Sequence, residues 1–293
     1  MRQGRVNRPS SCIGRKLGVT LGVVDIIVTG AGGKLGRLLR AAWLENPPSG
    51  LRPIWSGRSE EFDLAWDILA DPTPDLPKGA VVLHLAGLVR GPGTVLQRNA
   101  AMVPPLLRTC RKAAVRRLFL ASTASVYAPD PNGAREEDAP APPGAYGAAK
   151  LAAEAMLDAG DMAATILRFG NIAGADALLG PRPPGEEIVL DPVPGHSGGP
   201  LRSWIGGRTL AGLLPALVRA DLPRILNVAC DPPLAMGDLL AASGLRWRYG
   251  PPNPDVVPAA VLSTRRLAAL VDLPKASPES IAAEAAWARG VLQ

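Results

Sequence analysis

The stretch "VTGAGGKLG", residues 28–36, decides the fold of this chain. It follows a short β-branched run, "DIIVT" (25–29), and it opens a run of apolar residues at helical spacing. Gly30 permits a tight turn, Gly33 lets the backbone approach a phosphate, and Gly36 lets the helix pack closely on the strand. The free amide groups at the helix start then favour an anion. The pattern predicts a strand, a loop and a helix that together bind the pyrophosphate of a dinucleotide.

Short apolar runs of the same kind recur along the chain and alternate with helical patterns. They are apolar nearly throughout, as strands of a parallel sheet covered on both faces are. The sequence therefore predicts an α/β fold, a Rossmann-type doubly wound parallel sheet. The expected strands are 25–29, 53–56, 81–86, 117–122, 165–169 and 224–229.

Two segments do not follow this alternation. Residues 174–202 are rich in glycine and proline, and residues 233–293 hold two helical patterns. We expect them to pack together as a small C-terminal substrate-binding cap over the carboxyl edge of the sheet, where ligands bind in such folds. The dinucleotide-binding domain would then comprise residues 25–173 and 203–232.

The positive charge of the chain is concentrated at its start. The net charge of the 293 residues is +6, and residues 1–24 hold five basic residues and no acid. The rest of the chain has 27 basic residues against 26 acidic ones, so the sequence argues against a nucleic-acid-binding protein. The leader 1–24 is expected to be disordered and dispensable, with binding to an anionic surface as the alternative.

Cysteine and histidine are scarce, which excludes several chemistries. Cys12, Cys110 and Cys230 are widely spaced, so neither a disulfide framework nor a metal site is expected. His84 lies in an apolar run and is expected in the core, whereas His196 is expected in a loop. The absence of a disulfide framework makes the reducing cytoplasm the expected location. No uncharged apolar run is long enough to cross a bilayer, so no membrane partner is expected.

The end of the second expected strand bears on the choice of cofactor. An acid that binds the ribose 2′-hydroxyl is expected about 20 residues after the glycine loop. The chain reads "WSGRSEE" (55–61) there, so that Gly57 stands in place of the acid and Arg58 follows. Since an arginine can pair with a 2′-phosphate, NADP is favoured over NAD. Glu60 and Glu61 remain alternative partners of the ribose.

Tyr146 and Lys150 stand four residues apart in "AYGAAKLAAE" (145–154). On a helix they share a face. A free phenol has a pKa near 10, and a nearby ammonium, helped by a positive nicotinamide, is expected to lower it. The pair can then act as a general acid and base at a hydroxyl or carbonyl group. A hydroxyl-rich segment, "STASVY" (122–127), ends the preceding strand.

These motifs together resemble the extended short-chain dehydrogenase/reductase family, its NAD-dependent epimerase/dehydratase group, from about residue 25 to the end. The matching segments are "TGAGGKLG" (29–36), "WDIL" (66–69), "HLAG" (84–87), "STASVY" (122–127), "YGAAK" (146–150), "RFGNIAG" (168–174) and "LRSWI" (201–205). The resemblance, together with Arg58, implies a cofactor site formed by Gly30, Gly32, Gly33, Lys34, Leu35, Gly36, Arg58, Asp67, Ile68, Leu85, Ala86, Gly87, Asn99, Tyr146 and Lys150.

The same resemblance implies catalytic and substrate-binding residues. Thr123, Tyr146 and Lys150 would be catalytic, and the substrate would be contacted by Ser125, Asn171 and Arg202. Arg202 matches an arginine that binds a substrate diphosphate in members that act on nucleotide sugars.

The chain also departs from the family pattern. Pro104 and Pro105 are expected to delay the helix that follows Asn99 and to leave Asn99 in a loop. Ser203 follows Arg202 where the family has an acid, and the cap is short. Both features weaken the interpretation that the substrate is a nucleotide sugar.

The favoured function is an NAD(P)-dependent oxidoreductase or epimerase-type enzyme that transfers a hydride at a hydroxyl or carbonyl carbon of a small-molecule substrate. The alternatives are a nucleotide-sugar epimerase or dehydratase that retains NAD, and a non-catalytic NADP-binding sensor or scaffold. The alanine-rich helix expected at 146–159 could form a homodimer or could pack internally.

Overall fold

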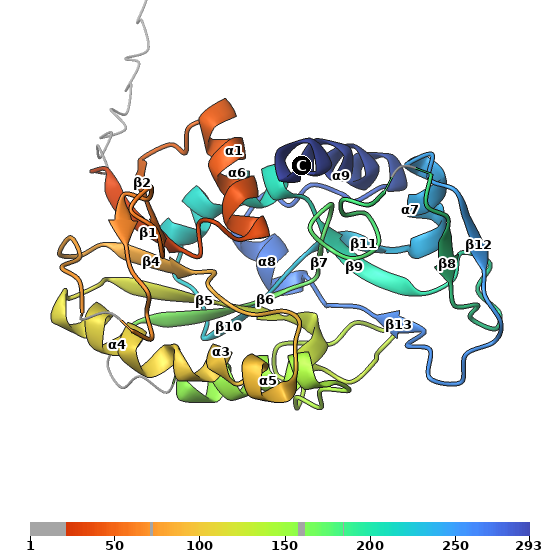
Figure 1. Cartoon of the computed structure of the whole chain (residues 1–293), viewed down its shortest axis with the longest axis horizontal. Coiled ribbons are helices and arrows are strands. Elements are labelled where there is room, and N and C mark those ends of the chain that lie inside the picture. The colour runs from red at the N-terminus through yellow and green to blue at the C-terminus, as the bar shows by residue number, and fades with distance from the viewer. Residues whose placement is uncertain (1–21, 71–72, 158–161, 184) are drawn as a thin grey trace, which may run out of the picture.

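The computed structural model describes residues 22–70, 73–157, 162–183 and 185–293. Its centre is a seven-stranded sheet in which every pair of neighbours is parallel, in the order β10-β6-β5-β4-β1-β2-β3 (Figure 1). The predicted doubly wound sheet is thereby confirmed. Its strands are β1 (Val24–Thr29), β2 (Leu51–Gly57), β3 (Leu64–Ala65), β4 (Val81–His84), β5 (Arg117–Thr123), β6 (Ala164–Phe169) and β10 (Ile225–Val228).

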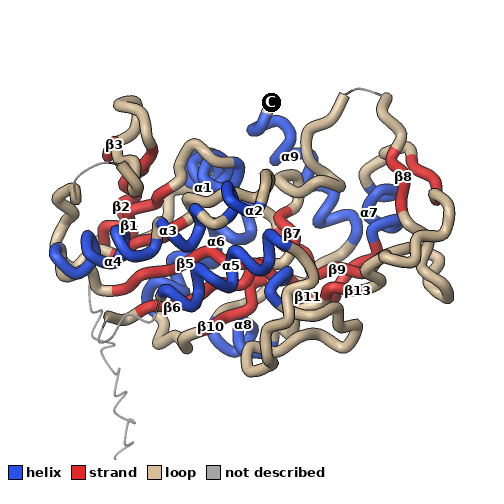
Figure 2. The backbone as a smooth tube through the Cα atoms, turned by 60° about the horizontal axis from the view of Figure 1, so that its bottom comes forward, coloured by secondary structure: helices blue, strands red, loops and turns tan. Residues whose placement is uncertain are grey.

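Helices cover both faces of this sheet (Figure 2). On one face α1 (Lys34–Glu45) packs against α6 (Gly207–Arg219). On the other face α3 (Arg98–Ala101) and α4 (Val103–Lys112) lie against α5 (Ala145–Met156).

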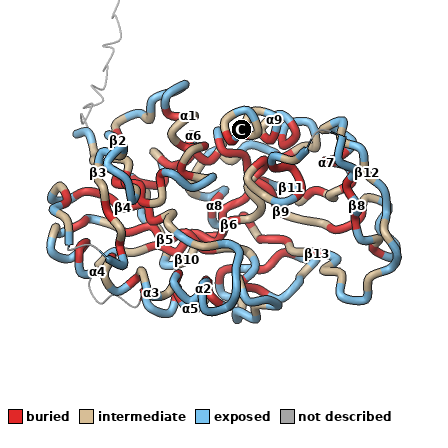
Figure 3. The backbone as a smooth tube through the Cα atoms, viewed as in Figure 1, coloured by how far each residue is buried: buried red, intermediate tan, exposed pale blue. Residues whose placement is uncertain are grey.

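Side-chain alternation along the strands divides the core into two layers. Ile26 and Val28 belong to the cluster that includes α1 and α6, whereas Ile27 between them belongs to the cluster on the α4 and α5 side. All three are fully buried, and the central strands are buried along most of their length (Figure 3). Burial on both faces explains why these strands are apolar at successive positions rather than at alternate ones.

Smaller sheets follow the carboxyl end of β6, on the right in Figure 1. In one of them β9 (Leu201–Ile205) lies between β11 (Cys230–Ala235) and β13 (Ala259–Ala260), and β9 also pairs with β7 (Asn171–Ile172). In another, β8 (Ile188–Leu190) pairs with β12 (Trp247–Tyr249). The short helix α7 (Met236–Ala242) follows β11 directly. The division of the chain into a dinucleotide-binding domain and a cap remains a prediction.

The last two helices contact the central unit. The helix α8 (Arg265–Leu270) packs on β10, and α9 (Pro278–Leu292) packs on α1, α6 and α7. The chain therefore returns at its end to the first helix of the fold. Of the predicted leader, residues 1–21 lie outside the described part of the chain.

The expected place of Asn99 in a loop is wrong. Asn99 lies in α3 and is 3% exposed, and α4 begins as a separate helix at Val103. Pro104 and Pro105 occupy the first turn of α4, where an amide hydrogen has no partner within the helix and its loss costs little. The prolines thus delay α4 as predicted, but a short helix precedes them instead of a loop.

The described residues contain neither a membrane-spanning helix nor a cluster of metal ligands. No helix in this part of the chain is long and apolar enough to cross a membrane. Within the same ranges, no three His, Cys, Asp or Glu side chains gather in a way that could hold a metal ion.

Candidate active site

The glycine loop lies against the segment that follows β4. Gly30 has φ +74°, and a Cβ atom there would lie 2.5 Å from the backbone nitrogen of Ala86. Gly36 lies against the backbone of Gly30 and Ala31, so a side chain would push α1 away from the loop. Gly33 is the first cap residue of α1, and its amide donates to the Gly30 carbonyl at 2.9 Å. The start of α1 therefore faces the crevice between the ends of β1 and β4.

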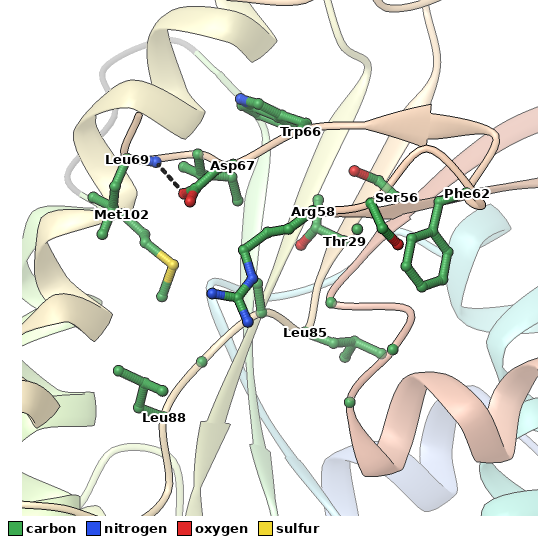
Figure 4. A pocket seen from close by; sticks show the side chains of 18 of the residues that line it. Thr29, Ser56, Arg58, Phe62, Trp66, Asp67, Leu69, Leu85, Leu88 and Met102 are labelled. Carbon is green, nitrogen blue, oxygen red and sulfur yellow. Dashed lines mark hydrogen bonds between the residues drawn. The ribbon is translucent and has the colours of Figure 1, made fainter. Parts of the chain in front are cut away.

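A cavity of about 680 Å³ opens at this crevice (Figure 4). Lys34, Leu35 and Gly36, which were also predicted to bind the cofactor, form the first turn of α1 and are not among the residues that line it. The predicted cofactor residues that do line it are Gly30, Gly32, Gly33, Arg58, Asp67, Ile68, Leu85, Ala86 and Gly87.

The end of β2 carries Gly57 in place of an acid, but Glu61 in the loop that follows also lines this cavity and accepts the Ser59 hydroxyl at 3.0 Å. Gly57 is covered by the ring of Phe62, which a Cβ atom at position 57 would strike. The ring lies 5.5 Å from the Arg40 guanidinium, which also lies over Trp55. Arg58 extends from the strand end into the middle of the cavity (Figure 4). Phe62 was missed by sequence reasoning, because nothing in the motif shows that the loop folds back over Gly57.

The opposite end of the cavity is formed by the segment after β3. Ile68 is buried, and the carboxylate of Asp67 accepts the amide of Leu69 at 3.1 Å (Figure 4). Leu69 and Met102 add an apolar wall that the sequence did not reveal. Such a wall suits the flat face of a base better than a charged group.

Lys150 and Asn99 meet at the cavity wall. A Cβ atom built on Gly87 would lie 3.1 Å from Lys150 Nζ and 2.8 Å from Asn99 Oδ1. The Asn99 side chain accepts the amide of Leu88 and donates to its carbonyl, each at 2.9 Å, which fixes this segment. Lys150 Nζ donates to the Ala121 carbonyl at 2.9 Å. Lys150, Asn99 and Tyr146 are not among the residues that line the cavity, and Lys150 and Asn99 lie next to it beside Gly87.

Tyr146 interacts with Thr123, as the motif requires, but its pKa is not lowered. Burial raises the pKa of the Tyr146 phenol, and the hydrogen bond with Thr123 opposes this shift. The predicted lowering by Lys150 is wrong for the protein chain alone. Burial also lowers the pKa of the Lys150 ammonium to about 8, against a raising effect of Glu154.

The predicted substrate residues lie in different elements. Ser125 is close to Thr123, whose hydroxyl donates to Ser125 Oγ at 3.3 Å and accepts the Ser125 amide. Asn171 begins β7. Arg202 donates to the carbonyls of Leu201 and Val257 at 2.8 and 2.9 Å. Within the described residues, no hydrogen bond or ion pair joins Asn171 or Arg202 to the Thr123–Tyr146 pair.

Arg202 lacks an ion-pair partner within the described part of the chain. Burial lowers the pKa of its guanidinium, and no carboxylate opposes this shift. A desolvated cation that is held only by carbonyl groups retains the capacity to bind an anion.

His84 lies in the core, as expected. Its Nδ1 is 2.8 Å from Thr29 Oγ1, and burial, with a smaller effect of Lys150, lowers its pKa to about 3. A histidine that stays neutral in this way is unsuited to act as a base near pH 7.

The parallel sheet, the glycine loop and the cavity at the point where the strand order reverses define a dinucleotide-binding protein of the Rossmann type. The model of the NAD dependent epimerase/dehydratase family matches residues 26–187, and the chain belongs to this family.

The similar proteins are epimerases and dehydratases of nucleotide sugars. The chain is 31% identical over 193 residues, 58% of its length, to UDP-glucose 4-epimerase of Azospirillum brasilense, and the match spans 54% of that relative. The solved structure of MoeE5 with UDP-glucose and NAD is 25% identical, with a TM-score of 0.70 over 92% of this chain and 100% of the other. TunA, an NAD-dependent NDP-hexosamine 5,6-dehydratase of tunicamycin biosynthesis, is 20% identical, with a TM-score of 0.74 over 91% of this chain and 98% of the other.

Proposed function

We propose that this chain is an enzyme that transfers a hydride between a nicotinamide dinucleotide and a hydroxyl-bearing carbon of a nucleotide sugar. The observation that carries the proposal is the meeting of Lys150 with the cavity wall at Gly87, while Tyr146 on the same helix face interacts with Thr123. A dinucleotide site and an acid–base pair are thus joined by a single helix.

Each residue has a role in this proposal. Thr123 holds the reacting oxygen of the substrate, and Tyr146 takes or gives its proton. Lys150 binds the nicotinamide ribose and supplies a positive charge near the phenol. The cofactor, when bound, accepts and returns the hydride. Because burial raises the pKa of Tyr146 in the chain alone, the charge of the cofactor would be needed to favour the phenolate.

The nucleotide-sugar class rests on Arg202 and on the relatives. Arg202 is a partly buried cation with no carboxylate partner in the described chain, and a diphosphate would supply the missing charge. The relative from Azospirillum brasilense is named as a UDP-glucose 4-epimerase, and MoeE5 was solved with UDP-glucose.

Small molecules carried through native purification test the proposal directly. Mass spectrometry should find a bound dinucleotide, and incubation with UDP-glucose or UDP-glucuronic acid should yield an epimer or a dehydrated product. Tyr146→Phe should abolish turnover and retain both cofactor and melting temperature. Turnover that survives in Tyr146→Phe would exclude the proposed acid–base role.

A second candidate is a reductase that exchanges NADPH, and the end of β2 favours it. The Phe62 ring leaves no room for an acidic side chain at Gly57, and Arg58 extends into the cavity where a 2′-phosphate would lie. The family is described as NAD dependent, and two MoeE5 structures and that of an epimerase contain NAD. We therefore propose a nicotinamide dinucleotide as the cofactor, and we propose a preference for NADP only on the strength of Gly57 and Arg58.

Titration of both cofactors separates the candidates. Arg58→Ala should weaken NADP binding by about ten- to a hundredfold, the loss of one charge-assisted hydrogen bond, and leave NAD unchanged. Arg108→Ala, at an exposed position of α4, is the matched control. A wild type that prefers NAD and an Arg58→Ala variant with unchanged affinities would assign the chain to the NAD-retaining class.

A further inference from the structure

A third polar residue follows Tyr146 and Lys150 on the same face of α5. Glu154 stands one turn after Lys150 and is 7% exposed. Arg168 Nη2 lies 2.6 Å from Glu154 Oε2, and Arg168 Nε lies 3.1 Å from Oε1. Ser122 Oγ also donates to Oε1. The two-point contact with a guanidinium and the added hydroxyl donor are the geometry of a fixed carboxylate.

The groups around Lys150 come from several elements. Tyr146 and Glu154 stand one turn before and one turn after it in α5, and Arg168 from β6 is the ion-pair partner of Glu154. The remaining neighbours are His84 from β4, the Ala121 carbonyl from β5 and Asn99 from α3. His84 stays neutral near pH 7, and burial keeps the Tyr146 phenol protonated. Of these neighbours in the described chain, Glu154 is the only one that carries a negative charge at neutral pH.

We infer that Glu154 is a positioning residue that keeps the side chain of Lys150 in its ammonium form. The inference rests on the proposed role of Lys150 at the cofactor ribose and beside Tyr146. It assigns to the buried Glu154–Arg168 pair a role in catalysis in addition to its role in packing.

The physical reason is the cost of burying a cation. A buried ammonium loses its hydration, and the Ala121 carbonyl replaces only part of it. A fixed carboxylate one helical turn away favours the charged form through a medium of low dielectric constant. Arg168 and Ser122 hold that carboxylate in place, and the Arg168 guanidinium itself lies 4.6 Å above the Tyr127 ring.

Nuclear magnetic resonance of the lysine side chains tests the inference without a substrate. The chain has only six lysines, so ¹³C-labelled lysine gives few signals, and Lys150→Arg identifies the signal of Lys150. In Glu154→Gln the pKa of Lys150 should fall by at least about one unit from its value of about 8, because a nearby charge is lost. Glu154→Asp, which retains a carboxylate, should restore most of the shift.

Glu136→Gln is the matched control. Glu136 is also a buried carboxylate, paired with Arg266 and bonded to the amide of Asn227. Its loss should reduce stability but leave the Lys150 signal unchanged. A Lys150 pKa that moves equally in Glu136→Gln and Glu154→Gln would reduce Glu154 to a structural residue.

A double variant guards against misfolding, because Glu154→Gln leaves a buried guanidinium without its partner. Glu154→Gln/Arg168→Met removes both charges, and the Lys150 pKa should fall less than in Glu154→Gln, because loss of the guanidinium opposes loss of the carboxylate. A wild-type pKa for Lys150 in folded Glu154→Gln, or a larger fall in the double variant than in the single one, overturns the inference. The Lys150 pKa can be measured even if the wild type is inactive on every nucleotide sugar. Failure of the proposed function can therefore be distinguished from failure of this inference.

Discussion

The glycines of the loop differ in how much space the structure leaves for a side chain. A Cβ atom on Gly33 would contact only the Gly30 carbonyl, at 3.2 Å, and the backbone of Gly33 is extended, with φ −72°. A side chain at this position needs only a small shift of one carbonyl group and is therefore much less costly to the fold than one at Gly30. At Gly30, by contrast, both the positive φ and the contact with Ala86 oppose any substitution.

Gly33→Val should accordingly abolish dinucleotide binding and leave the melting temperature nearly unchanged, because the valine would occupy the path of the pyrophosphate. Isothermal titration with NAD and NADP measures the effect. Gly212→Ala, in α6 with nothing within 4 Å of the added atom, is the control for a harmless extra methyl group. Unchanged affinity in Gly33→Val would move the cofactor away from the loop.

His84 predicts how stability changes with pH. Its folded-state pKa of about 3 lies below the ordinary value of 6.5, so the unfolded chain binds the proton more readily. The contribution of His84 to stability is present above pH 6.5 and is lost as the pH falls toward 3. Between pH 6.5 and 4 the loss should be about 2 to 3 kcal/mol.

Urea unfolding of the wild type and of His84→Asn over this pH range checks the prediction. Asparagine can replace the bond to Thr29 but does not titrate, so its stability should fall less steeply with decreasing pH. Parallel curves for the two proteins would show that His84 does not couple protonation to unfolding.

Local motifs made much of the site predictable at this scale. Glycine spacing and the four-residue interval between Tyr146 and Lys150 each depend on one element, and the structure places the glycine loop at the cavity and Lys150 beside Gly87 in its wall. Phe62 was not predicted as a site residue because the fold of the loop after Gly57 cannot be read from the sequence, and Glu154 was not predicted because its partner Arg168 lies in another element. Burial of the Tyr146 phenol, which raises its pKa in the chain alone, cannot be read from a motif either.

At the scale of elements, α6 begins without a capping side chain of its own. Gly206 precedes the helix, and the amides of Arg208 and Thr209 donate instead to the carboxylate of Glu284 in α9, at 3.0 and 2.9 Å. The Thr209 hydroxyl donates to the same carboxylate at 2.6 Å. A side chain at Gly206 would collide with Glu284. The glycine thus leaves the space in which the Glu284 carboxylate caps α6.

Glu284→Ala should destabilise the protein by about 1 to 2 kcal/mol, the usual cost of losing a helix cap. Chemical denaturation provides the measurement. Glu186→Ala provides the comparison, because Glu186 is exposed and its side chain makes no hydrogen bond or ion pair within the described residues. A loss no larger than that of Glu186→Ala would mean that water caps α6 equally well.

Prediction of the elements succeeded where periodicity is strong and was wrong where two short elements meet. The strands from 81 and from 117 and the helix that starts near Tyr146 were predicted within a few residues. The segment around Asn99 was expected to be a loop because two prolines follow it. A helix can end and another can begin within a few residues, and composition does not distinguish this arrangement from a loop.

At the scale of the whole molecule, the central sheet begins at Val24, two residues into the described part of the chain. Val23 is 70% exposed, and the first bond of the strand is donated by the Val24 amide to the Gly50 carbonyl at 3.0 Å. Deletion of residues 1–22 should therefore leave the melting temperature and cofactor affinity unchanged. Differential scanning calorimetry measures the first of these, and a fall of several degrees would show that the leader packs on the fold.

The contact of α9 with α1 has a consequence for the order in which the protein is made. Leu38 in α1 is covered by Ala288 and Leu292, and the Arg37 guanidinium binds the last carbonyls of α9. Synthesis proceeds from the amino terminus, so α1 is made long before α9, the helix that covers Leu38. Until α9 has left the ribosome, this apolar side of α1 has no covering helix, and a chaperone that binds apolar surface has a place to bind there.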